Sequence, residues 1–278
     1  MKASQARVVL TGASGGIGQA AALALAQAGA SVLLSGRSPA RLCAQARALQ
    51  QRMPQVQVDW HEVDLQRMDS IASLAKQAAE WRCNVLIHCA GVAEFGRFDH
   101  STPDRMAAIL HTNLLAPMVL TQALLPHLRS LPQAQVICVG SVLGAMGLPG
   151  FSVYCASKFG LRGFAQALRR ELADTAVRVQ FLGPRSTRTP FNTAEVSDYN
   201  QATRTAMDTP EVVAQALLKM LQTGSAERFL GFPEKLGVRL NGLMPSLLEG
   251  AFKKHRASLP IPLMTPSPST HKELKNAN

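Results

Sequence analysis

Tyr154, Lys158 and Ser141 have the side chains and the spacing needed for acid–base chemistry at one site. Tyr154 and Lys158 lie four residues apart in a stretch of helical period, so the phenol and the ammonium share one face of a helix. A phenol with a pKa of about 10 is a poor acid or base at neutral pH, and we expect the Lys158 cation to favour the phenolate. Ser141 follows the apolar run 136–140, where its hydroxyl could hydrogen-bond a carbonyl oxygen at the end of a strand. We therefore expect the three residues to act together.

Residues 11–18, TGASGGIG, have the features of a phosphate-binding turn. They directly follow a short apolar run and open a helical stretch. Glycine permits a tight turn and a close approach of the backbone to a pyrophosphate, while free N–H groups and the helix dipole attract its charge. The segment predicts a dinucleotide site, with contacts expected from Gly12, Ser14, Gly16, Ile17 and Gly18.

The end of the second apolar run indicates which dinucleotide binds. The sequence there is Gly36-Arg37-Ser38, with no Asp or Glu to bind a ribose diol and with an Arg that could bind a 2′-phosphate. NADP(H) is therefore preferred to NAD(H). The alternative, which a single sequence leaves open, is that Arg37 is a solvated loop residue.

These residues must be positioned by alternating strands and helices. Short Val- and Leu-rich runs alternate with longer Ala- and Leu-rich stretches of helical period, a pattern typical of βαβ units. Strands are predicted at residues 8–11, 31–35, 56–60, 85–88, 135–140, 177–182 and 228–230, and the first two helices at 16–28 and 39–51. The predicted class is α/β, with a single Rossmann-type, doubly wound parallel sheet flanked by helices.

The motifs resemble those of the short-chain dehydrogenase/reductase family over about residues 7–189. Residues 11–18 match the family's TGxxxGxG turn, Tyr154 and Lys158 its YxxxK motif, and Ser141 and Asn113 its active-site serine and asparagine. The resemblance implies an NADP(H)-dependent oxidoreductase that interconverts a carbonyl and an alcohol. Tyr154 would donate a proton to the substrate oxygen while the nicotinamide delivers hydride, and Ser141 would orient the carbonyl.

The resemblance also implies roles for residues outside these motifs. Lys158 would hold the nicotinamide ribose, Asn113 would hold a water that links Lys158 to solvent, and Asp64 would meet the adenine. The cofactor contacts expected beyond the glycine turn are Arg37, Asp64, Leu65, Ala90, Gly91, Tyr154, Lys158, Pro184, Thr187 and Thr189.

Two segments depart from the family pattern. His88-Cys89 stands where the family has two asparagines before Ala-Gly, so the hydrogen bonds with which an asparagine braces the sheet are in doubt. Arg185 replaces the glycine of the family's Pro-Gly turn, and we expect it to reshape the nicotinamide pocket or to meet a substrate anion.

Composition limits the class of protein and its partners. The 278 residues include 29 Lys and Arg against 18 Asp and Glu, a balance of +11 that favours a phosphorylated cofactor, nucleic acid or an acidic membrane surface. The basic residues are dispersed and aromatics are 5% of the chain, which argues against nucleic acid. The seven histidines lack metal-ligand spacing, so no metal is expected, and the five scattered cysteines predict no disulfide framework.

The start of the chain leaves no room for a secretory signal, and the apolar stretches are interrupted before about 20 residues, so we expect a cytoplasmic protein without a transmembrane helix, or one peripheral to a membrane. One domain is expected over residues 1–257, with a flexible Pro-rich tail at 258–278.

The substrate is expected to be apolar, such as an acyl, isoprenoid or steroid-like carbonyl or alcohol. Residues 190–208 would form a mobile lid, and pocket walls would come from residues 142–151 and from the apolar segment 236–252. That segment, followed by a basic cluster, could instead lie on a membrane surface. A further alternative is that its apolar residues pack between subunits of a homodimer or homotetramer, as Leu243, Leu247, Leu248 and Phe252 could do.

Two other functions stay open. The first is reduction of a 3-oxoacyl thioester on an acidic carrier protein, with Arg162, Arg169, Arg170 and Arg185 as the docking surface. The second is a non-catalytic NADP(H)-binding regulator or scaffold, against which the intact Ser, Tyr and Lys set argues.

Overall fold

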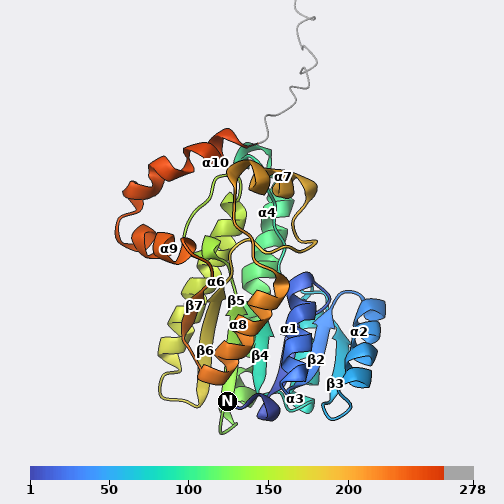
Figure 1. Ribbon diagram of the computed structural model, residues 1–278. Coiled ribbons are helices and arrows are strands. Elements are labelled where there is room, and N and C mark those ends of the chain that lie inside the picture. The colour runs from blue at the N-terminus through green and yellow to red at the C-terminus, as the bar shows by residue number, and fades with distance from the viewer. Residues whose placement is uncertain (260–278) are drawn as a thin grey trace, which may run out of the picture.

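The computed structural model describes residues 1–259, apart from the side chains of Leu247 and Leu248. The tail predicted at 258–278 lies almost wholly outside the described residues. From Arg7 to Phe229 the chain alternates between strands and helices (Figure 1).

Seven parallel strands form one sheet in the order β3-β2-β1-β4-β5-β6-β7. They are β1 Arg7–Thr11, β2 Ser31–Gly36, β3 Val58–Glu62, β4 Val85–His88, β5 Ala134–Val139, β6 Val177–Gly183 and β7 Glu227–Phe229. The central strands are continuously apolar because both of their faces are buried; Val8, Val9 and Leu10 of β1 have no exposed surface. The predicted α/β class and each predicted strand, within two residues of its bounds, are confirmed.

Helices cover both faces of this sheet (Figure 1). One apolar core joins α1, α2 and α8 to one face, and a second joins α3, α5 and α6 to the other. The helices are α1 Gly16–Gln27, α2 Pro39–Arg52, α3 Met68–Glu80, α4 Pro103–Leu110, α5 Ala116–Arg129, α6 Ser152–Glu171, α7 Ala194–Thr203, α8 Pro210–Thr223, α9 Glu234–Leu243 and α10 Lys253–Ala257.

A π-helical turn, His111–Leu115, joins α4 and α5 into one helix, Pro103–Arg129. By length and composition alone, this helix is long and apolar enough to cross a membrane. The sequence had led us to expect no stretch of that length. The helix residues Leu120, Leu124 and Leu128 are buried in the core that α5 shares with α3. Packing inside the domain accounts for these residues, whereas Leu110, Leu115 and Met118 of the same helix are 38–41% exposed.

The order of the strands places a crevice at one end of the sheet. The chain moves outward from β1 to β2 and β3, then returns to the other side of β1 to form β4, so the loops after β1 and β4 diverge there. The segment 190–208, expected to be a loop, contains α7, because Thr193 caps the helix by accepting the Val196 N–H at 3.3 Å and Tyr199 is buried. Helices α7 and α10 lie together at one end of the molecule (Figure 1).

Candidate active site

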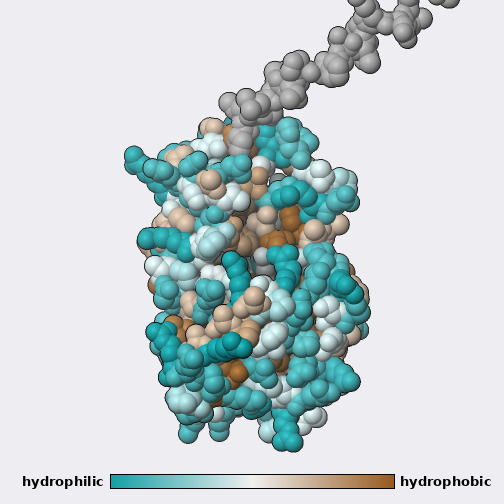
Figure 2. All heavy atoms as spheres, turned by 90° about the vertical axis from the view of Figure 1, so that its right-hand side faces the viewer, coloured by the Kyte–Doolittle hydropathy of each residue, from teal (hydrophilic) through white to brown (hydrophobic). Residues whose placement is uncertain are grey.

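A cleft of about 1230 Å³ lies at the carboxyl ends of the strands. It exceeds the range of about 300–1,000 Å³ that is usual for a single small ligand, so it has room for a dinucleotide and a substrate. The expected site residues that line it are Gly12, Ser14, Gly16, Ile17, Gly18, Arg37, Asp64, Leu65, Ala90, Gly91, Ser141, Tyr154, Lys158, Pro184, Thr187 and Thr189. Figure 2 shows a recess in the upper half of the face, with hydrophobic side chains along part of its rim and hydrophilic ones along the rest.

The glycine turn requires glycine for steric reasons. Gly12 has a φ of +67°, and a Cβ there would lie 2.7 Å from the Cα of Ala90. The turn ends at Gly15, the N-cap of α1, which supplies no side chain to the first N–H groups of the helix. These N–H groups are therefore open to an anion, and the segment fits the pyrophosphate of a dinucleotide.

Thr11 and His88 form the hydrogen bonds that hold the end of β4. The Thr11 hydroxyl accepts the N–H groups of Cys89 at 3.1 Å and Ala90 at 3.2 Å. The buried His88 ring pairs through Nε2 with the Thr121 hydroxyl of α5 at 2.8 Å. Burial, with a smaller effect of Lys158, lowers the pKa of His88 to about 3, so its ring is neutral. With His88-Cys89 in these positions, the end of β4 is still held by hydrogen bonds, and Ala90 lies beside the glycine turn.

Two arginines lie where the cleft passes the end of β2. Arg37 and Arg41 both line the cleft and are exposed. Neither has a carboxylate within 4.0 Å among residues 1–259, so both cations face solvent. Across the cleft, Asp64 accepts the Gln66 N–H at 3.0 Å, which shapes the turn after β3.

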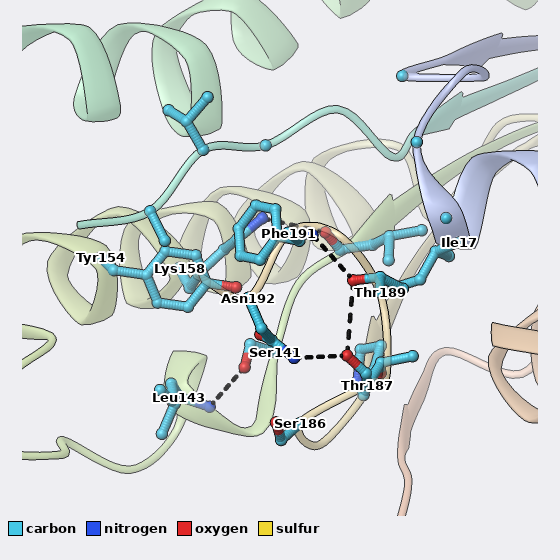
Figure 3. Close-up of a pocket in the computed structure, with 18 of the residues that line it drawn as sticks. Ile17, Ser141, Leu143, Tyr154, Lys158, Ser186, Thr187, Thr189, Phe191 and Asn192 are labelled. Atoms are coloured by element: carbon cyan, nitrogen blue, oxygen red, sulfur yellow. Dashed lines mark hydrogen bonds between the residues drawn. The ribbon is translucent and has the colours of Figure 1, made fainter. Parts of the chain in front are cut away.

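Tyr154, Lys158 and Ser141 converge at the other end of the cleft (Figure 3). Tyr154 and Lys158 come from the first two turns of α6, and the Lys158 Nζ lies 5.7 Å from the centroid of the Tyr154 ring. Lys158 is buried and donates to the Val139 carbonyl at 3.3 Å. Ser141 follows β5, and its Oγ accepts the Leu143 N–H at 3.1 Å, which leaves the hydroxyl hydrogen free to donate.

Electrostatics at this end differ from the expectation. Burial raises the pKa of Tyr154, and the Ser141 hydrogen bond opposes that rise. The expected net shift toward the phenolate is therefore wrong: burial dominates the pKa of Tyr154, and the phenol is a neutral proton donor at pH 7. Burial lowers the pKa of Lys158 to about 8, which still leaves a cation at neutral pH.

Asn113 lies behind the cleft, in the π-helical turn between α4 and α5. Its Oδ1 accepts the Val92 N–H at 2.9 Å, and its Nδ2 donates to the Val92 carbonyl at 2.8 Å and to Ser157 Oγ at 3.0 Å. The side chain thus joins the loop after β4 to α6. The expected link from Lys158 to solvent through Asn113 stays a prediction.

Aromatic and aliphatic side chains form the wall next to Tyr154. Phe151 and Phe191 line the cleft, and the Phe191 ring lies 6.2 Å from the Tyr154 ring. Tyr199 of α7 packs against this group and its hydroxyl pairs with His255 Nδ1 of α10 at 2.7 Å. The other apolar residues that line this end are Val142, Leu143, Met146, Leu148 and Val196.

The C-terminal segment contributes different residues from those expected. Pro233, Glu234 and His255 line the cleft, whereas Leu243 is 79% exposed and does not. The expected apolar wall from residues 236–252 is therefore wrong: none of the described side chains of that segment lines the cleft, and the outer face of α9 points away from it.

Two of the arginines expected to contact a partner or a substrate form ion pairs with carboxylates of this chain instead. Arg185 pairs with Asp208 at 2.7 Å and Glu234 at 3.4 Å, so the expectation that it meets a substrate anion is wrong. Arg162 forms two hydrogen bonds with Glu227, at 2.7 and 3.0 Å. The docking surface expected for an acidic carrier protein thus loses two of its four cations.

Several residues of the cleft escaped the sequence analysis. Arg41 lies in the first turn of α2, four residues after Arg37, so its place near the end of β2 could have identified it, and Gln66 directly follows Leu65. Glu234 and His255 had no such signal, because only the folded chain brings them to the cleft.

Comparison with known proteins agrees with this geometry. The family model described as short chain dehydrogenase matches residues 6–200. The chain is 32% identical over 255 residues to Dehydrogenase/reductase SDR family member 7B of Bos taurus, covering 86% of this chain and 78% of that protein. It is 30% identical over 258 residues to 17-beta-hydroxysteroid dehydrogenase type 1 of Homo sapiens, covering 80% of this chain and 78% of the relative.

Solved structures share the fold and contain two forms of the cofactor. A short-chain dehydrogenase from Sphingobium yanoikuyae in complex with NADPH has a TM-score of 0.76 and 26% identity, covering 87% of this chain and 95% of its own. A short chain dehydrogenase/reductase from Burkholderia phymatum in complex with NAD has a TM-score of 0.80 at 20% identity, covering 89% and 96%, and shows the fold alone. With the family model matching well over half of its length, this chain belongs to the short-chain dehydrogenase/reductase family of nicotinamide-dependent oxidoreductases.

Proposed function

We propose that the protein is an NADP(H)-dependent oxidoreductase that interconverts a carbonyl and an alcohol on an apolar substrate. One observation carries the proposal: Tyr154, Lys158 and Ser141 meet at one end of the cleft whose other end holds the glycine turn and Arg37. A dinucleotide with its phosphates at the N-terminus of α1 would extend along the cleft toward the three reacting side chains.

The residues of the chain have complementary roles in this reaction. When bound, the nicotinamide supplies the hydride that adds to the carbonyl carbon. The Ser141 hydroxyl donates a hydrogen bond to the carbonyl oxygen, and the neutral Tyr154 phenol transfers its proton to that oxygen as negative charge develops there. The buried Lys158 cation, held on the Val139 carbonyl, stabilises the phenolate that remains. Oxidation of the alcohol uses the same groups in reverse.

The preference for NADP(H) rests on Arg37 and Arg41. Both cations lie beside the turn after β2, where the adenosine ribose of a dinucleotide is bound in this fold, and both lack acidic partners among the described residues. A 2′-phosphate would satisfy them. Related structures contain either NADPH or NAD, so the preference is a property proposed for this chain from its own residues.

The choice of an apolar substrate rests on the wall beside Tyr154. Phe151, Phe191, Leu148 and Met146 surround the space next to the phenol. Burial of an aliphatic or ring-containing group against them would supply the binding energy. A relative that is 30% identical acts on a steroid, as its name states, which supports the same class.

We also propose that the outer face of α9 binds an anionic membrane surface. Leu236 and Leu243 lie on one face of that helix and are 48% and 79% exposed, with Lys235 and Arg239 beside them. Apolar side chains flanked by cations are typical of a surface that rests on anionic lipid. The alternative is that a second copy of the chain packs on this face of α9 in a homodimer or homotetramer. Sedimentation with anionic vesicles, against sedimentation equilibrium without lipid, separates the two.

A panel assay tests the catalytic proposal. Purified protein is mixed with NADPH and with ketones of increasing size, and oxidation of the cofactor is followed by absorbance. Turnover that favours bulky apolar ketones and is lost in Tyr154→Phe, with NADPH binding retained, is the expected result. Binding of NADPH without turnover across the panel would indicate a regulator or scaffold, and turnover confined to carrier-linked 3-oxoacyl thioesters would indicate the carrier-dependent reductase.

A further inference from the structure

Arg185 joins two segments that are far apart in the sequence. It directly follows Pro184 at the end of β6, and its guanidinium reaches Asp208 and Glu234. Nε and Nη2 donate to Asp208 Oδ1 at 2.9 and 2.7 Å, and Nη1 lies 3.4 Å from Glu234 Oε2. The three side chains are 19%, 10% and 17% exposed, so the cluster is largely shielded from water.

The two carboxylates belong to the elements that enclose the substrate end of the cleft. Asp208 is the last residue of the lid, residues 190–208, and its backbone pairs with Ser186 and Arg188 at 2.9 Å each. Glu234 begins α9, and its side chain lines the cleft beside Pro233. Arg185 is thus a charged link between the base of the lid and the first turn of α9.

The backbone at Gly231 is adapted to this cluster. Gly231 has a φ of +86°, and a Cβ there would lie 2.6 Å from Arg185 Cδ and 2.5 Å from Glu234 Oε2. No larger residue fits without moving the ion pair. This packing is a second observation, independent of charge, that the cluster is built into the fold.

We propose that Arg185 is a positioning residue that holds the lid and α9 together and so sets the size of the pocket for the apolar substrate. The proposal rests on the proposed function for its substrate. Removal of the guanidinium would leave two shielded carboxylates next to each other, and their repulsion and need for water would separate the lid from α9. The proton-transfer groups would keep their contacts, because none of the hydrogen bonds of Tyr154, Lys158 or Ser141 involves Arg185.

The test compares Arg185→Met with two controls. Arg185→Lys keeps the charge, and Arg162→Met removes an arginine that is paired just as closely, with Glu227, but does not line the cleft. For Arg185→Met we expect KM for a bulky apolar ketone to rise at least tenfold, while kcat, KM for cyclohexanone and the NADPH dissociation constant change less than threefold. Both controls should keep KM for the bulky ketone within threefold of the wild-type value.

Hydrogen–deuterium exchange provides a readout that does not depend on activity. In Arg185→Met, the amides of residues 190–208 and 234–243 should exchange at least fivefold faster than in the wild type, while those of α1 and α8 should not change. If the wild type reduces no ketone at all, the proposed function fails, and this exchange arm still decides the positioning role.

Two results would overturn the proposal. The first is unchanged hydrogen–deuterium exchange in residues 190–208 and 234–243 together with an unchanged KM for the bulky ketone. The second is a general loss of function, seen either as an equal loss of kcat with bulky and small ketones or as a loss of NADPH binding. If Arg185→Met does not fold, the variant Arg185→Met/Asp208→Asn/Glu234→Gln, which leaves no unbalanced charge, takes its place. Faster exchange of the lid in that variant supports the role, and wild-type exchange refutes it.

Discussion

Substitution of Arg37 by glutamine tests the cofactor preference. A charge-assisted hydrogen bond is worth about 1.5–3 kcal/mol, and the lower end applies here because Arg37 is exposed and screened by solvent. A loss of about 1.5 kcal/mol corresponds to roughly a tenfold change in binding. Arg37→Gln should therefore lower kcat/KM for NADPH about tenfold and leave kcat/KM for NADH nearly unchanged, because NADH lacks the 2′-phosphate.

The assay is steady-state kinetics with both cofactors at saturating ketone, repeated at about 0.05 and 0.5 M salt. Higher salt should reduce the difference between the wild type and the variant, since exposed charges are screened. Arg47→Gln, an exposed residue of α2 outside the cleft, is the matched control. Because Arg41 could compensate in part, Arg37→Gln/Arg41→Gln should show a larger effect. Equal losses with NADPH and NADH, or an equal effect of the control, would refute the assignment of these arginines to the 2′-phosphate.

Three further substitutions test separate parts of the site. Ser141→Ala should lower kcat about 10²–10³-fold with little change in NADPH binding, measured by single-turnover kinetics, because it removes a donor to the developing oxyanion; an unaffected kcat would contradict that role. His88 has a folded pKa of about 3 against about 6.5 when unfolded, so the unfolded chain binds more protons between these values and stability falls as the pH falls through that window. In urea titrations from pH 6.5 to 4.5, the free energy of unfolding of His88→Asn should therefore fall less steeply with falling pH than that of the wild type, by up to about 1.4 kcal/mol per pH unit. An equal slope of unfolding free energy against pH in the two proteins would refute the buried neutral ring. Gly12→Ala should destabilise the protein by more than about 1 kcal/mol, because a Cβ would meet Ala90, whereas Gly163→Ala on an open face of α6 should not lower Tm.

Local patterns in the sequence predicted the sheet and most of the site. The central strands are short apolar runs because a parallel sheet covered on both faces buries nearly all of their side chains, and that requirement is visible residue by residue. The glycine turn and the Tyr154–Lys158 pair are equally local, since the spacing along one helix or turn fixes their geometry. For these reasons the sequence alone was enough to place the cofactor-binding residues and the acid–base residues in one cleft.

Other features depend on contacts that no local pattern encodes. Arg185 finds its partners 23 and 49 residues away, and Tyr199 meets His255 only after the chain has folded over the cleft. The direction of the Tyr154 pKa shift was wrong because burial outweighs the neighbouring charge, and burial is a property of the whole fold. Helix α7 was missed within a polar segment, although Thr193 ahead of Val196 is a recognisable cap.

The ion pairs of Arg185 have a consequence for engineering by loop exchange. A graft of residues 190–208 from another enzyme would bring its own amino acid to position 208. The Arg185 guanidinium would then lose its ion pair with Asp208. Chimaeras that aim to change substrate range should therefore transfer positions 185, 208, 231 and 234 as one block, since any of them moved alone is mismatched with the other three.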